Sequence, residues 1–169
     1  MSIIPRFFME ATVVLGRLPI LNPRWCATGF VVGRYEGTQD GNEKFSTYLI
    51  TNRHVVENEE KMVMQVNLQN GVKAYLLSLA SENSTPNYSA HPAADVIACH
   101  ININPALSEG AQLPFFDLRH HTVVVSVDSI KEVVEIERTR AYGAASNDCI
   151  LSIEPYKIGT PVEIPACVG

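Results

Sequence analysis

Two residues in the first two thirds of the chain have the chemistry of a general base and of the acid that orients it. His54 lies just beyond the apolar run Tyr48-Leu49-Ile50, so its ring is expected at the mouth of a buried strand. Asp95, in HPAADVIACHI, opens another apolar run, where a carboxylate is costly to bury unless it has a partner. An aspartate that accepts the N–H of one imidazole nitrogen fixes the tautomer and leaves the other nitrogen to take a proton.

Short strands separated by turn residues are the elements that must bring this pair together. The separation is 95 − 54 = 41 residues, enough for intervening strands to return the acid to the base. β-Branched and aromatic residues mark six predicted strands, which are Glu10–Leu15, Thr28–Gly33, Ser46–Thr51, Lys61–Asn67, Val72–Leu79 and Asp95–Ile101. Asn70-Gly71 favours a tight hairpin between the fourth and fifth strands. The prediction is an all-β fold with one six-stranded antiparallel barrel, because closure removes exposed strand edges.

The regular pattern of short strands and turns ends near residue 118. HTVVVSV predicts a further strand, and DSIKEVVEIERTR predicts a short helix capped by Asp128 or Ser129. The apolar residues assigned to one side of that helix are Ile130, Val133, Val134 and Ile136. One or two weak strands follow. We therefore divide the chain into a barrel, residues 1–118, and a divergent tail, residues 119–169, with a partial or absent second barrel.

Three segments together resemble the first half of a trypsin-like serine peptidase of the chymotrypsin fold. They are ATGF at residues 27–30, TNRH at residues 51–54 and DVIA at residues 95–98. The similarity covers roughly residues 8 to 118 and is closest to bacterial trypsin-like peptidase domain proteins, which usually lack the family's disulfides. It implies a barrel of the chymotrypsin type, His54 as general base, Asp95 as its orienting acid, a protein or peptide substrate and no cofactor.

The family's nucleophile has no counterpart in this sequence. It lies in Gly-x-Ser-Gly-Gly, whose glycines let backbone N–H groups converge on the developing oxyanion. The nearest candidate, Ser146 in GAASNDC, lies 146 − 95 = 51 residues after Asp95 and no glycine follows it. The 169 − 118 = 51 residues of the tail are too few for a second complete barrel, in which the family has its specificity pocket.

Two functional hypotheses follow from this mixture. The first is a serine-type endopeptidase homologue, truncated and inactive as this chain. The alternative is a non-catalytic trypsin-like half-barrel that acts as a protein-interaction module. A half-barrel exposes the apolar face that packs against the second barrel, so self-association is expected.

Other titratable residues have structural explanations. His91-Pro92 predicts a loop, and His100 alternates with apolar residues as a partly buried strand residue. His120 and His121 are adjacent, so they point to opposite faces of a strand and do not support a shared metal. Asp117 is expected in a solvated turn.

The cysteines support neither a metal site nor a disulfide framework. Cys26, Cys99, Cys149 and Cys167 form no Cys-x-x-Cys pair, so zinc has no spacing support. We expect buried thiols, and nothing around Cys149 would activate it as a nucleophile.

Net charge and the lengths of the apolar runs limit the classes of partner and the compartment that we expect. The net charge is −5 and no Lys/Arg cluster occurs, which argues against nucleic acid. No apolar run reaches the ~18 residues needed to span a bilayer. The opening MSIIPRFFMEATVVLG lacks the features of a secretory signal, so a cytoplasmic protein is expected.

Overall fold

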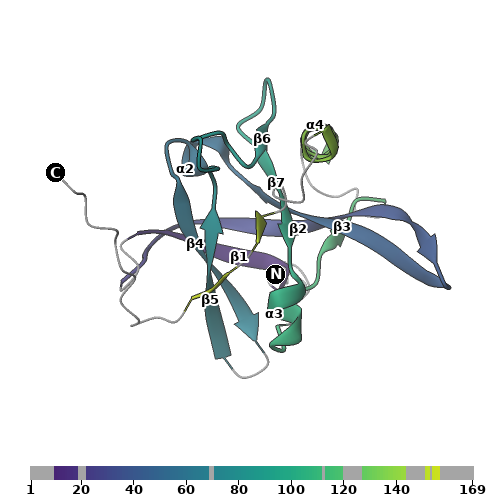
Figure 1. Cartoon of the computed structure of the whole chain (residues 1–169), viewed down its shortest axis with the longest axis horizontal. Helices are drawn as coiled ribbons and strands as arrows, with labels where there is room; N and C mark the ends of the chain where they lie inside the picture. Colours follow the sequence, from purple (N-terminus) through teal and green to yellow (C-terminus); the bar gives the residue numbers. More distant parts are fainter. Residues whose placement is uncertain are drawn as a thin grey trace, which may run out of the picture.

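The computed structural model describes residues 10–18, 22–68, 71–111, 113–119, 127–143, 151–152 and 154–156 (Figure 1). The strands are β1 (Thr12–Arg17), β2 (Arg24–Gln39), β3 (Asn42–Thr51), β4 (Lys61–Leu68), β5 (Gly71–Ser78), β6 (Ser89–Ala90), β7 (Ile97–Asn102), β8 (Phe116–Asp117), β9 (Leu151–Ser152) and β10 (Glu154–Tyr156). The helices are α2 (Arg53–Val56), α3 (Asn104–Ser108) and α4 (Val127–Gly143). No helix in the described ranges is both long enough and apolar enough to cross a membrane.

The strands form one mostly antiparallel sheet, as predicted. Its order is β10-β5-β4-β1-β2-β3-β7-β6, and every neighbouring pair along this path is antiparallel. Two short strands join in parallel, β8 beside β2 and β9 beside β7. No ladder among the described residues closes the sheet upon itself, so it is an open sheet in which the long β2–β3 hairpin projects from the rest (Figure 1).

Turn chemistry explains two differences from the predicted strand bounds. β2 and β3 extend to the pair Gln39↔Asn42, so much of the expected loop YEGTQDGNE is paired strand. Asp40 (φ 53°) and Gly41 (φ 79°) make the reversal in left-handed backbone conformations, which aspartate and glycine adopt most readily. In the β4–β5 hairpin Gly71 pairs with Leu68, so Gly71 belongs to the ladder and not to the turn that was expected at Asn70-Gly71.

Strand alternation sends side chains into two apolar clusters on opposite faces of the sheet. On β3, Leu49 belongs to the larger cluster, while Tyr48 and Ile50 belong to the second. On β7, Cys99 and Ala98 divide in the same way. Both faces are buried here because helix α4 covers the second one, packing against β6 and β7 (Figure 1).

The buried side of α4 differs from the predicted one at a single position. Ile130, Val133 and Val134 are buried as expected, but Ile136 is 41% exposed and Glu137 is fully buried. Positions three, four and seven residues after Ile130 form one helical stripe, and position 136 lies beside it. A carboxylate therefore occupies the place where an apolar side chain was expected.

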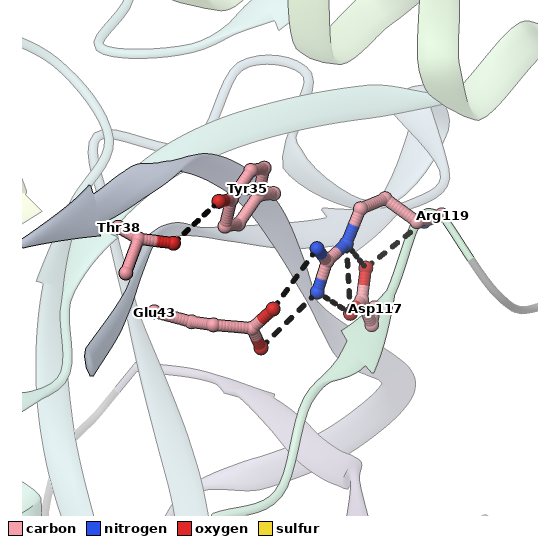
Figure 2. Close-up of polar contacts among 5 residues, drawn as sticks. All are labelled: Tyr35, Thr38, Glu43, Asp117 and Arg119. Carbon is pink, nitrogen blue, oxygen red and sulfur yellow. Dashed lines mark hydrogen bonds and ion pairs between the residues drawn. The ribbon is translucent and has the colours of Figure 1, made fainter. Parts of the chain in front are cut away.

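Arg119, two residues after β8, forms ion pairs that link this segment to the β2–β3 hairpin (Figure 2). Its guanidinium binds Asp117 at 2.7 Å and Glu43 at 3.1 Å, and it lies over the Tyr35 ring with 4.1 Å to the centroid. The two carboxylates raise the pKa of Arg119 above its ordinary value. Asp117 is therefore an ion-pair partner, and its expected place in a solvated turn is wrong.

The two cysteines within the described ranges are free thiols with opposite environments. Cys99 is fully buried, and burial raises the pKa of its thiol. Cys26 is exposed, contrary to the expected burial, because it lies at the start of β2, where Arg24 and Trp25 are exposed as well. Cys149 and Cys167 lie outside the described residues.

Candidate active site

His54 lies in helix α2, just past the end of β3, because the strand stops at Thr51 and the helix starts two residues later. The Thr51 hydroxyl donates to the carbonyl oxygen of Thr28 on β2 at 3.0 Å. Gly29 allows the two strands to pack this closely, since a Cβ there would lie 2.9 Å from the carbonyl oxygen of Ile50. The Thr-Gly pair that the sequence analysis singled out thus supports the strand end that carries His54.

Asp95 binds His54 with both carboxylate oxygens. Its Oδ2 lies 2.5 Å from Nδ1 of the imidazole, and its Oδ1 accepts the backbone N–H of His54 at 3.1 Å. Asp95 precedes β7, which begins at Ile97, instead of opening the strand as expected. Outside the ladder the side chain can turn sideways toward the end of β3.

This contact defines the chemistry of the ring. A carboxylate on Nδ1 keeps that nitrogen protonated, so Nε2 carries a lone pair and can accept a proton. Side-chain exposure is 70% for His54 and 50% for Asp95, so the pair is open to an incoming group. The arrangement is that of a general base with its orienting acid.

Hydrogen bonding also sets the charge state of Asp95. The bond from the His54 side chain is the main cause that lowers the pKa of this carboxyl below its ordinary value near 3.8. Desolvation opposes that shift, and the backbone N–H groups of His54 and Arg53 add to it. Asp95 is consequently ionised at neutral pH and can balance a positive charge on the imidazole.

Two neighbours of His54 hold the loop that carries Asp95. Asn52 donates from its side-chain amide to the carbonyl oxygen of Asp95 at 3.0 Å. Arg53 donates from Nη2 to the carbonyl oxygens of His91 and Ala94, the latter at 2.9 Å. Sequence reasoning missed both roles, because their partners lie about forty residues away and only the adjacency to His54 hints at them.

The remaining candidate residues do not join this pair in the described ranges. Ser146, Cys149, His120 and His121 lie outside the described residues, so the structure says nothing of them. Within the described ranges no group of three or more His, Cys, Asp or Glu side chains could hold a metal ion. His100 stacks on Tyr48 with 4.9 Å between ring centroids, and burial lowers its pKa.

Comparison with known proteins found no matching family model, no matching curated protein and no matching solved structure.

Proposed function

We propose that this chain is a serine-endopeptidase-like domain in which His54 is the general base and Asp95 its orienting acid. The observation that carries the proposal is the two-point contact of the Asp95 carboxylate with the ring and backbone of His54. In peptide hydrolysis Nε2 would take the proton of a serine hydroxyl as its oxygen attacks the carbonyl carbon. The same nitrogen would then return the proton to the leaving amine.

The sheet order supports a barrel of the chymotrypsin type as the framework. Six strands that correspond to the six predicted ones lie in the order β5-β4-β1-β2-β3-β7. A further pairing between β5 and β7 would close them into a ring. In the tail, β9 pairs with β7 and β10 pairs with β5, so these two short strands lie beside the two strands that a closed barrel would join.

The nucleophile is the missing part of the proposed machinery. The sequence contains no Gly-x-Ser-Gly-Gly, and no glycine follows Ser146. A base and acid without a nucleophile lose most of the ~10⁶-fold acceleration that such a triad provides. We therefore propose that this chain alone is an inactive homologue that turns over peptide bonds at a negligible rate.

Hydrolysis of an activated ester tests the base and acid without requiring a serine. His54 can activate water toward p-nitrophenyl acetate, so the wild-type chain should exceed the His54→Ala and Asp95→Asn variants. The amide of the second variant carries no negative charge to hold Nδ1–H and to balance the imidazolium. Glu82→Gln, which changes an exposed carboxylate, is the matched control and should retain the wild-type rate. Equal rates in all four proteins would refute the proposed pair.

A fluorophosphonate probe tests the nucleophile separately. The proposal of an inactive chain predicts no labelling. Labelling that disappears in Ser146→Ala would identify Ser146 as a working nucleophile and overturn the inactivity, while retaining the roles of His54 and Asp95.

A protein-interaction module remains the second candidate, favoured by the missing nucleophile motif and by the exposure of the pair. On that proposal exposed apolar side chains of the sheet would contact a partner or a second copy. Trp25 on β2 and Val72 on β5 are 42% and 53% exposed. Static light scattering distinguishes the candidates, since a monodisperse monomer at high concentration would contradict self-association through these side chains.

A further inference from the structure

Helix α4 contacts the segment that carries Asp95 at several points. Glu137 Oε2 accepts the hydroxyl of Ser89 at 2.7 Å, and its Oε1 accepts the backbone N–H of His100 at 3.3 Å. Between these two ends, Glu132 lies 2.6 Å from Nε2 of His91. The helix therefore contacts residues 89–100 at both ends and at His91, two residues after Ser89.

His91 is the buried histidine of this segment. Its residue is 6% exposed, and its Nδ1 accepts the backbone N–H groups of Ala93 at 3.1 Å and Ala94 at 2.9 Å. A ring nitrogen that accepts two N–H groups carries no proton, so the proton of the neutral ring is on Nε2. That nitrogen faces Glu132, and all the hydrogen bonds of the ring are therefore satisfied by one tautomer.

Asp95 follows directly on the loop that this ring organises. The His91 ring fixes the loop from inside through Ala93 and Ala94, and Arg53 fixes it from the α2 side through the carbonyl oxygens of His91 and Ala94. A carboxylate needs placement within about 0.5 Å to make two aligned hydrogen bonds to one partner residue. The loop geometry therefore decides whether Asp95 meets both donors of His54.

We infer that His91, supported by Glu132 on α4, is a positioning residue that holds Asp95 against His54. Its catalytic meaning rests on the proposed function, but its structural effect does not. The inference gives α4, a helix of the divergent tail, a role in ordering a pair that lies entirely in residues 1–118. It also distinguishes His91 from the partly buried His100, whose ring stacks on Tyr48.

Nuclear magnetic resonance of the full chain measures this effect without any substrate. One readout is the downfield proton shared by His54 Nδ1 and Asp95, and the other is the carboxyl titration of Asp95. His91→Phe should remove the shared-proton signal and return the pKa of Asp95 toward its ordinary value. Exchange of the Ala93 and Ala94 amide protons should accelerate roughly tenfold, the loss expected for one hydrogen bond each.

Conservative variants separate positioning from simple packing. In His91→Asn the side-chain oxygen can accept the same two N–H groups in an Asx turn, so the Asp95 signals should remain close to wild type. Glu132→Ala should broaden or shift the shared-proton signal, whereas Glu132→Gln retains an acceptor and should restore it. Glu135→Ala is the matched control on the same helix, since Glu135 binds Arg34 and does not contact this segment.

The outcomes distinguish this inference from the proposed function. Unchanged Asp95 signals in folded His91→Phe would overturn the inference. If His91→Phe fails to fold, Glu132→Ala becomes the deciding variant, because Glu132 is exposed and its replacement should leave the fold intact. Unchanged Asp95 signals in Glu132→Ala would overturn the role of α4. If His54→Ala hydrolyses the ester at the wild-type rate while the His91 and Glu132 variants change the Asp95 signals as expected, only the proposed function is refuted.

Discussion

Replacing Glu137 by alanine should destabilise the fold more than any other carboxylate substitution on α4. The residue is fully buried, and its two oxygens accept hydrogen bonds from Ser89, His100 and Arg140. Alanine would leave the buried Ser89 hydroxyl and the His100 N–H without an acceptor, and it would open a small cavity under the helix. The perturbation therefore acts on the contact between α4 and the sheet.

The magnitude follows from the groups left behind. A buried donor that loses its acceptor costs ~1–3 kcal/mol, and breaking a buried ion pair costs ~3–5 kcal/mol. The Arg140 side chain is 26% exposed and can regain water, so the low end of these ranges applies. We expect Glu137→Ala to lower the free energy of unfolding by about 3 kcal/mol. For a chain of this size that lowers Tm by roughly 6–12 °C.

Urea unfolding followed by far-ultraviolet circular dichroism measures this loss. The midpoint should fall without a change in the denaturant slope, because the exposed surface on unfolding is nearly unchanged. Glu135→Ala is the matched control. Its side chain is 54% exposed and pairs with Arg34 at 2.5 Å, so it should cost only ~0–1 kcal/mol. Equal losses in the two variants would refute the assignment of Glu137 as a buried anchor.

Three further predictions concern the core, the acid and the helix contact. Leu49→Ala removes a side chain that is 1% exposed in the larger apolar cluster, so calorimetry should show that the free energy of unfolding falls by ~2–5 kcal/mol. The control Val72→Ala changes an exposed side chain and should cost only ~0.5 kcal/mol. Similar losses in the two variants would contradict the placement of the core. Because the folded-state pKa of Asp95 is lowered, its contribution to stability is present above its unfolded value near 3.8 and is lost as pH falls through the folded value. The difference in unfolding free energy between wild type and Asp95→Asn should therefore shrink in acid titrations below about pH 4, and a constant difference would argue against the ionised pair. Val133→Asp puts a charge into the fully buried contact of α4, so light scattering should show self-association once the helix detaches, and a folded monomer would contradict this.

Local sequence signals predicted the strands and the place of His54. Alternation of β-branched and aromatic residues located six strands, although β2 extends beyond both of its predicted ends, and the run Tyr48-Leu49-Ile50 ends where polar residues begin. The Asp40-Gly41 turn is an equally local signal, and it lengthens β2 and β3 beyond their predicted bounds. The predicted closure into a barrel, by contrast, would need β5 to pair with β7, and no ladder among the described residues joins them.

The environments of the polar residues came from the tertiary structure alone. Sequence placed His91 in a loop, but its partner Glu132 lies 41 residues away on α4. Position 137 lies on the apolar stripe of α4, but glutamate is a residue type that is rarely buried, and its partner Ser89 lies 48 residues away. Such contacts depend on how α4 packs against the sheet. Helical periodicity determines which residues of α4 share one face, but it does not determine which surface that face packs against.

The sequence by itself determined that this chain would form antiparallel strands and would carry a histidine just past the end of one and an aspartate near the start of another. Those features follow from side-chain alternation and turn chemistry, which act over a few residues. The two-point contact between Asp95 and His54, and the loop that holds it, were decided only in three dimensions. A hydrogen bond forms only within a few ångströms, and the folded sheet with α4 against it is what brings residues so far apart in the chain to that distance.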